Sequence, residues 1–164
     1  MVSRVSGEER TMRMTMAATE LTRALYRVQG IADKKSTMPV LAHVLLRADP
    51  ESGLHVSATD LDVGLRGSYP AQVESSGAVA VHAKQFYEIV KSLTEDSVSL
   101  EVQDNNWVEI CSGASRFRLV GMNADEFPAL PDPGEMNTFS VSSKELASAH
   151  RPNPLLRFHR GQPP

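Results

Sequence analysis

The chain has 164 residues, of which 41% are hydrophobic and 23% charged, as is usual for one folded domain in water. Its net charge is −3, and residues 1–150 carry 14 basic against 20 acidic groups, which excludes a generally basic nucleic-acid-binding domain. One cysteine excludes an internal disulfide, and the lack of a bilayer-length apolar run or signal-peptide core predicts a cytoplasmic protein with no membrane partner.

The first half of the chain predicts one helix among short strands. We expect residues 1–11 to be a disordered extension and residues 12–17 to form a strand. A helix should then run from Glu20 to Gln29, with Thr19 as its N-cap and Gly30 at its end. Apolar or alternating residues predict three further strands, over 40–46, 54–59 and 63–69.

The second half repeats the same pattern. A strand over 78–81 leads into a helix from Ala83 to Leu93, and three strands follow over 98–102, 107–111 and 115–120. Turns are expected at Asp104–Asn106 and at Gly113. The organisation is therefore β-α-β-β-β twice over, an α+β fold with two helices on one side of a strand-rich layer.

A recurring element sets the expected domain boundaries. Residues 14–21, 79–86 and 139–146 each read as a strand, a small polar residue and a helix start, at offsets of 65 and 125 residues from Met14. One domain should hold two copies, and a second domain should begin near Thr138. We expect a folded domain over 12–131, a linker and the start of a second domain over 132–150, and an aberrant tail rich in proline and arginine over 151–164.

The two predicted helices carry basic residues away from their apolar stripes. Arg23 and Arg27 are four residues apart, and Lys84 and Lys91 are seven apart, so each pair shares a helix face. Two equivalent helices side by side would place all four cations on one surface. Such charges are most often solvated helix faces, and a nucleic-acid surface is the rarer alternative.

Other candidate sites favour structural roles. Asp60 and Asp62 could hold Mg²⁺, but a turn that satisfies backbone donors fits their position better. The histidines lack metal-ligand spacing, and Cys111 and Trp107 lie within strands where packing is the usual role. We expect no catalytic residue, no metal and no cofactor. The strand with Phe117 and Leu119 alternating with Arg116 and Arg118 is either half-buried or an edge that pairs with another chain.

Several segments together resemble one family, the bacterial sliding clamp, which is the beta subunit of DNA polymerase III. The segments are Thr37-Met38-Pro39-Val40-Leu41-Ala42-His43-Val44-Leu45-Leu46, Ala58-Thr59-Asp60-Leu61-Asp62, residues 83–93, Ser112-Gly113-Ala114-Ser115-Arg116-Phe117-Arg118-Leu119 and residues 124–131. Each is a weak signal alone, whereas their order and spacing from Met12 to Leu146 are specific.

The resemblance implies a non-catalytic processivity factor for DNA replication. Chains of this family have three similar domains, form a ring around duplex DNA and tether the polymerase, with the clamp loader as a further partner. By position, it implies phosphate contacts with duplex DNA from Arg23, Arg27, Lys35, Lys84 and Lys91. It likewise implies a subunit interface built from Gln85, Arg116, Phe117, Arg118 and Leu119.

The chain also departs from the family pattern. It stops one helix into the second domain, so we expect a truncated and defective clamp subunit that lacks the pocket for clamp-binding peptides. The alternative is a standalone interaction module, in which the strand over 115–120 binds full-length clamp or another protein.

Overall fold

A computed structural model describes residues 12–32, 38–130 and 140–149, and it divides the chain into one unit up to Leu130 and another from Pro131. The predictions for residues 1–11, for Lys35 and for the tail over 151–164 lie outside the described residues. In the second unit the described element is a short helix, α3 (Ser143–Ala149).

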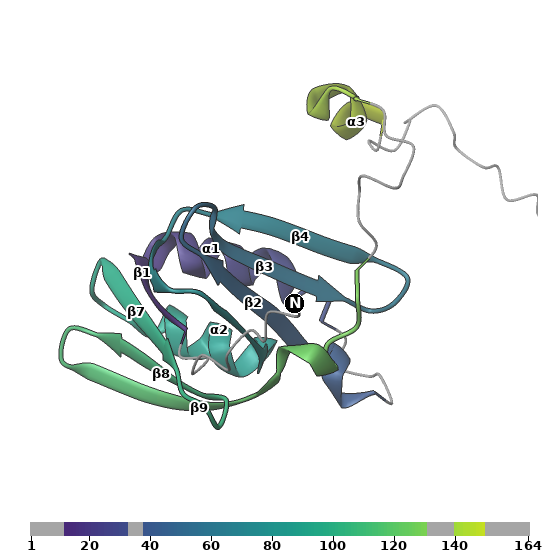
Figure 1. Cartoon of the computed structure of the whole chain (residues 1–164). Helices are drawn as coiled ribbons and strands as arrows, with labels where there is room; N and C mark the ends of the chain where they lie inside the picture. The colour runs from purple at the N-terminus through teal and green to yellow at the C-terminus, as the bar shows by residue number, and fades with distance from the viewer. Residues whose placement is uncertain (1–11, 33–37, 131–139, 150–164) are drawn as a thin grey trace, which may run out of the picture. The chain divides into compact units, whose positions relative to one another are not determined.

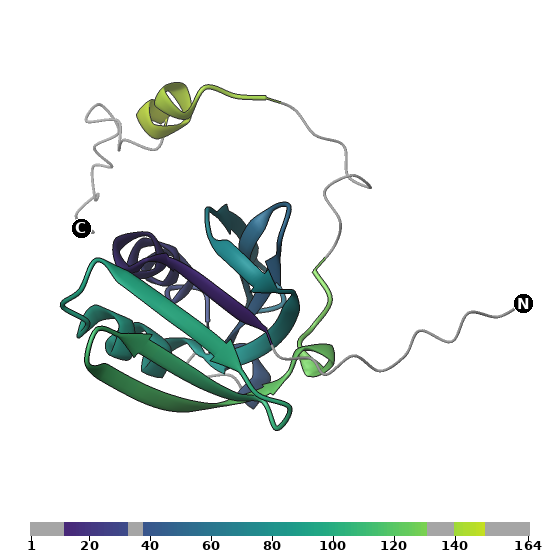
Figure 2. The same cartoon turned by 60° about the vertical axis from the view of Figure 1, so that its left-hand side comes forward.

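The first unit contains a nine-stranded antiparallel sheet in the order β4-β3-β2-β6-β9-β8-β7-β1-β5 (Figure 1). Both long helices, α1 (Ala18–Val28) and α2 (Ala83–Lys91), pack on the same side of this sheet (Figure 2). The strands are β1 (Arg13–Ala17), β2 (His43–Asp49), β3 (Gly53–Thr59), β4 (Gly64–Tyr69), β5 (Gln72–Ser75), β6 (Gly77–His82), β7 (Ser97–Val102), β8 (Trp107–Ser112) and β9 (Ser115–Asn123).

The predicted repeat is confirmed as β1-α1-β2-β3-β4 followed by β6-α2-β7-β8-β9. The strand β5 was not predicted, because its four residues are too few to show a clear alternation. It pairs with β1 through Met14 and Val73, at the far end of the sheet from β4. The fold class is α+β, as the sequence predicts.

The strand β9 joins the two halves of the sheet. Residues 115–120 pair with β8, whereas residues 121–123 pair with β6 on the opposite side of the strand. Gly121 stands where the partner changes, and a Cβ atom there would lie 2.6 Å from Val79 Cγ2 and 2.7 Å from the carbonyl oxygen of Asn106. Only glycine leaves room for this close approach.

The helix α1 begins earlier than predicted. It starts at Ala18, and its N-cap is Ala17, which makes no side-chain cap, so the expected N-cap role of Thr19 is wrong. The backbone N–H of Ala18 instead donates to the carbonyl oxygen of Asp96 at 2.8 Å. A tertiary contact therefore satisfies one of the helix donors that the sequence assigned to a capping side chain.

Two other boundaries also differ. Residues Pro39–Ala42 form a 3-10 turn, η1, where a strand from Val40 was expected, because a proline at the first position favours a helical start. The helix α2 ends at Lys91 rather than Leu93. Both helices bury an apolar stripe in one core, whose largest fully buried side chains include Phe86, Met12, Met14, Leu21, Leu25, Leu46, Leu54, Leu100 and Ile110.

Candidate nucleic-acid interface and strand edge

The exposed side of α1 and α2 carries the predicted basic residues. Leu21, Leu25 and Val28 of α1, like Phe86 and Val90 of α2, are buried in the core. Since these residues fix which side of each helix faces the sheet, the opposite side carries the exposed cations Arg23, Arg27, Lys84 and Lys91. We call the surface formed by these four residues the helical basic surface.

Two tyrosines join the helices at this surface. The rings of Tyr26 on α1 and Tyr87 on α2 lie 6.4 Å apart, centroid to centroid, at 45°. The Lys91 ammonium lies 5.9 Å from the centroid of the Tyr87 ring, within the range of a cation–π contact. These contacts bring the exposed sides of the helices together, so the cations of both belong to one surface.

The four cations differ in how far they are neutralised. Arg23 Nη1 lies 2.8 Å from Glu20 Oε1, one turn earlier on α1. Arg27 and Lys84 have no ion-pair partner among the described residues. The helical basic surface therefore keeps a net positive charge within a chain whose total charge is −3.

A histidine caps the start of α2. The Nδ1 atom of His82 accepts a hydrogen bond from the backbone N–H of Gln85 at 3.4 Å, so this nitrogen carries no proton. The ring of His43 lies edge-on to His82, with centroids 5.5 Å apart. Burial lowers the pKa of His82, and the charges of His43 and Lys84 lower it further. The neutral form of His82 is thus the form that holds the helix start.

One side of the strand β9 pairs with β8, and over residues 115–120 the other side is a free edge. Alternate residues of a strand direct their backbone groups to opposite sides. The N–H of Gly121 bonds to the carbonyl oxygen of Asn106 on the β8 side, at 2.9 Å. Residues 116, 118 and 120 therefore direct their backbone groups away from β8, and no described strand pairs with them there, because β6 pairs with β9 only at residues 121–123. We call residues 115–120 the β9 edge.

Three of the predicted interface residues are accessible beside this edge. Arg116 and Arg118 are exposed. Gln85 is also exposed, and it lies in the first turn of α2, which follows the end of β6 where β6 pairs with β9. Phe117 is half-buried. Leu119 differs from the expectation of an interface residue, because its side chain is 7% exposed and belongs to the domain core.

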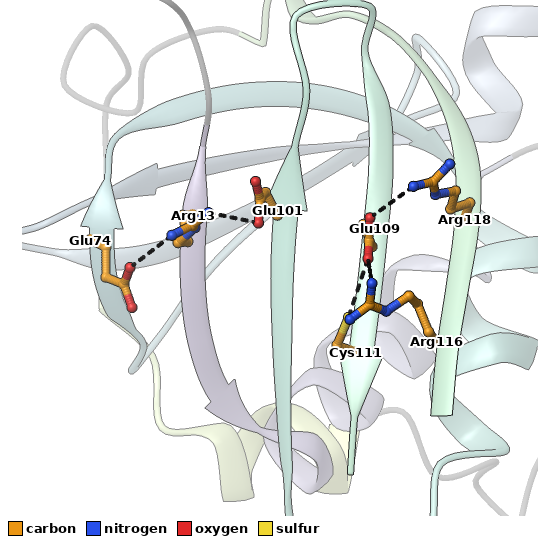
Figure 3. A network of polar contacts seen from close by, with 7 residues as sticks. All are labelled: Arg13, Glu74, Glu101, Glu109, Cys111, Arg116 and Arg118. Carbon is orange, nitrogen blue, oxygen red and sulfur yellow. Dashed lines mark hydrogen bonds and ion pairs between the residues drawn. The ribbon is translucent and has the colours of Figure 1, made fainter. Parts of the chain in front are cut away.

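Ion pairs cover the outer side of the sheet, opposite the helices (Figure 3). Glu109 on β8 forms two ion pairs, from Oε1 to Arg116 Nη1 at 3.1 Å and from Oε2 to Arg118 Nη2 at 3.4 Å. Arg13 on β1 binds Glu101 on β7 at 2.9 Å, and this contact raises the pKa of the guanidinium. Both β9 arginines are therefore held over the sheet by an acid of their own domain.

The remaining candidates take the structural roles that the sequence favours. Asp60 Oδ1 accepts hydrogen bonds from the backbone N–H groups of Asp62 at 3.1 Å and Val63 at 2.7 Å, which makes a turn rather than a metal site. Within the described ranges no group of three potential metal ligands occurs. Cys111 is a partly exposed free thiol whose Sγ lies 3.7 Å from Glu109 Oε1.

Sequence reasoning missed the role of Tyr26. It lies one residue before Arg27 on the exposed side of α1, and it is not one of the basic residues that define a phosphate-binding surface in a sequence. The sequence does place an aromatic residue off the apolar stripe and between two arginines, and this pattern could have indicated an exposed ring on the basic surface. Trp107 was expected to pack in the core or on the sheet, and it lies on the outer side, opposite Val120 and 38% exposed.

Comparisons with known proteins agree on one family. The family model described as DNA polymerase III beta subunit, N-terminal domain, matches residues 12–131. Proteins named beta sliding clamp from Chlamydia muridarum and Caulobacter vibrioides are 32% and 34% identical over 135 and 137 residues. Each alignment covers 82% of this chain and 37% of the relative, so the chain spans little more than a third of their length.

Solved structures give the same result. A Caulobacter crescentus pol III beta structure is 34% identical, with a TM-score of 0.74 over 82% of this chain and 36% of that one. A DNA polymerase sliding clamp from Bacillus subtilis is 28% identical, with a TM-score of 0.73 over 77% and 35%. The beta subunit of Streptococcus pyogenes DNA polymerase, at 22% identity and a TM-score of 0.77 over 83% of this chain and 37% of that one, supports the fold alone.

Proposed function

This chain belongs to the DNA polymerase III beta subunit family, and on that premise we propose that residues 12–131 act as a sliding-clamp domain whose helices face duplex DNA. The observation that carries the proposal is the helical basic surface, in which Arg23, Arg27, Lys84 and Lys91 are all exposed on two adjoining helices. Lys35 is a further DNA contact in this proposal, from the family resemblance alone.

The proposed role is tethering rather than catalysis. Flexible cations on helix surfaces attract phosphates without reading bases, so binding is independent of sequence and sensitive to salt. Such contacts hold no preferred register, which allows the domain to move along the duplex. No covalent step, metal or cofactor takes part, and the domain serves replication as a processivity factor in the cytoplasm.

Encircling DNA takes more than one such domain. The described residues up to Leu130 make one, and we propose that the region over 132–150, with α3, begins a second. The β9 edge is the proposed subunit interface, through Gln85, Arg116, Phe117 and Arg118. DNA polymerase and the clamp loader are partners of the longer assembly.

Among the described helices, none has the length and apolar character that crossing a bilayer requires.

A direct test measures duplex binding against salt. We would titrate a fluorescein-labelled duplex with the wild-type chain and with a variant carrying Arg23→Gln, Arg27→Gln, Lys84→Gln and Lys91→Gln, following fluorescence anisotropy from low salt upward. Each lost phosphate contact should reduce the slope of log K against log[salt] by about 1. A single domain needs low salt for measurable binding.

The sheet supplies a matched control. Arg116→Gln with Arg118→Gln removes two exposed arginines from the outer side of the sheet, away from the helices. Duplex affinity and salt slope should then stay close to wild type. Because the control removes two charges and the helix variant four, a loss in the control about half that in the helix variant would mean that net charge alone drives binding, and the proposed DNA-facing surface would be wrong.

A second candidate function rests on the β9 edge. Its unpaired backbone groups fit strand addition, so the chain could act as a module that binds full-length clamp or another protein. Size-exclusion chromatography with light scattering, on this chain alone and mixed with full-length clamp, tests this role. A mixed species that forms equally well with and without DNA supports the module, and an unchanged clamp dimer beside free monomer counts against it.

A further inference from the structure

Among the described residues up to Leu130, the most exposed large apolar side chain lies on the helical basic surface. Tyr26 is 66% exposed and does not belong to the hydrophobic core. Its neighbours Arg23 and Arg27 belong to the same exposed side of α1. Tyrosine is a poorer helix former than arginine, lysine or glutamine at an exposed position. Neither burial in the core nor helix propensity therefore accounts for an aromatic ring at this position.

One contact orients the ring and leaves most of it open. The partner, Tyr87, is half-buried and packs against the core, so it provides a fixed support 6.4 Å from Tyr26. Lys91 lies over the Tyr87 ring at 5.9 Å. The result is an aromatic side chain on the same surface as the cations, 66% exposed and so available to a ligand.

We propose that Tyr26 is a base-stacking residue through which the helical basic surface binds single-stranded DNA. The proposal rests on the proposed function, since the same cations attract the phosphates. Binding of single strands generally combines a positive surface with aromatic rings on which bases stack. In a duplex the bases are already stacked on each other, so Tyr26 can reach only the backbone there. The ring therefore adds affinity for a single strand and little for a duplex.

The test compares two DNA probes with substitutions at one position. Tyr26→Leu removes the aromatic face but keeps an apolar side chain, whereas Tyr26→Phe keeps the ring and removes the hydroxyl. Tyr26 is exposed, so circular dichroism should show an unchanged fold for both variants. We would measure anisotropy at low salt with a labelled oligothymidylate and with a labelled duplex of the same length.

Tyr26→Leu should weaken oligothymidylate binding about fivefold to a hundredfold, the range measured for loss of one stacked base. Duplex binding should change less than about twofold, as expected for a side chain without a base contact. Tyr26→Phe should retain the affinity for the single strand. As an aromatic control, Trp107→Leu on the outer side of the sheet should leave both affinities unchanged.

The outcomes separate this inference from the proposed function. If Tyr26→Leu binds oligothymidylate like wild type while the four-glutamine variant loses both probes, stacking is wrong and the phosphate surface stands. If Tyr26→Leu loses both probes equally, the tyrosine supports the surface without distinguishing strands, and the inference is also wrong. If the wild-type chain binds neither probe at low salt, both proposals fail.

Discussion

Glu101 and Glu109 lie directly opposite each other on the adjacent strands β7 and β8. Like charges in this position repel each other. Each carboxylate is balanced from its outer side, Glu101 by Arg13 of β1 and Glu109 by Arg116 and Arg118 of β9. The acidic pair at the centre thus connects the first strand of the chain with the strand that carries the free edge.

Removing one of these charges should change stability little. In Glu109→Gln, the loss of attraction to two exposed arginines is offset by the loss of repulsion from Glu101. We expect the free energy of unfolding in urea to change by less than about 1 kcal/mol. A loss above about 2 kcal/mol would show that these ion pairs hold the sheet together, contrary to their exposure of 70% and 61% at the arginines.

Proline substitutions should distinguish the free side of β9 from the side that pairs with β8. The backbone N–H of Arg118 points to the free edge, whereas that of Phe117 points to β8. Arg118→Pro should leave the domain folded and abolish any complex with full-length clamp, since proline cannot donate to an added strand.

Phe117→Pro should unfold the domain, because it breaks the ladder with β8. Arg118→Ala is the control for loss of the side chain: it keeps the backbone N–H, so clamp binding should weaken less than in Arg118→Pro. Circular dichroism and size-exclusion light scattering report folding and association. A folded Phe117→Pro variant with normal stability would contradict the assignment of which side of β9 is free.

His82 should make stability depend on pH. Its pKa is lowered below 6.5 in the folded chain by burial, with smaller contributions from His43 and Lys84. Because the unfolded chain then binds a proton more readily, the contribution of neutral His82 is complete above pH 6.5 and is lost as the pH falls from there through the folded pKa.

His82→Asn should remove this component, since asparagine also accepts the cap hydrogen bond but does not titrate. Urea unfolding of both proteins between about pH 5 and pH 8, a range set by the histidine pKa, gives the comparison. Parallel stability curves for the two proteins would contradict the role of His82 as a titrating cap.

Gly121 should tolerate no side chain. In Gly121→Ala the new methyl group would meet Val79 and the Asn106 carbonyl, and we expect a loss of about 1–3 kcal/mol of unfolding free energy, typical of overpacking. Gly30→Ala is a matched control, because nothing lies within 4 Å of its Cβ position and its φ is negative. Equal stability of the two variants in urea would mean that β9 can shift where its partner changes.

Local patterns predicted most of the fold, and tertiary contacts account for the differences. The spacing of Leu21, Leu25 and Val28 was enough to orient α1, because an apolar stripe must face the core. The start of α1 was predicted at the wrong residue because Asp96, far away in sequence, accepts the hydrogen bond of Ala18. No local pattern reveals such a partner.

The candidate sites show the same division. The four helix cations could be placed on one surface from their spacing, since two repeats with equivalent helices imply a common exposed side. The Tyr26–Tyr87 contact could not be predicted, because it depends on how closely α1 and α2 approach. The family resemblance placed Leu119 at an interface, whereas its alternation with Arg116 and Arg118 also allowed a half-buried strand, and the structure buries its side chain in the core.

The change of partner at Gly121 limits where a strand added to β9 can end. Val81 of β6 already occupies the position beside Gly121, and α2 begins two residues later. An incoming strand that starts beside Ser115 therefore meets the end of β6 after Val120 and cannot slide further along. The domain therefore sets one end of the added strand, and a partner shifted toward Gly121 would meet β6 before it could pair.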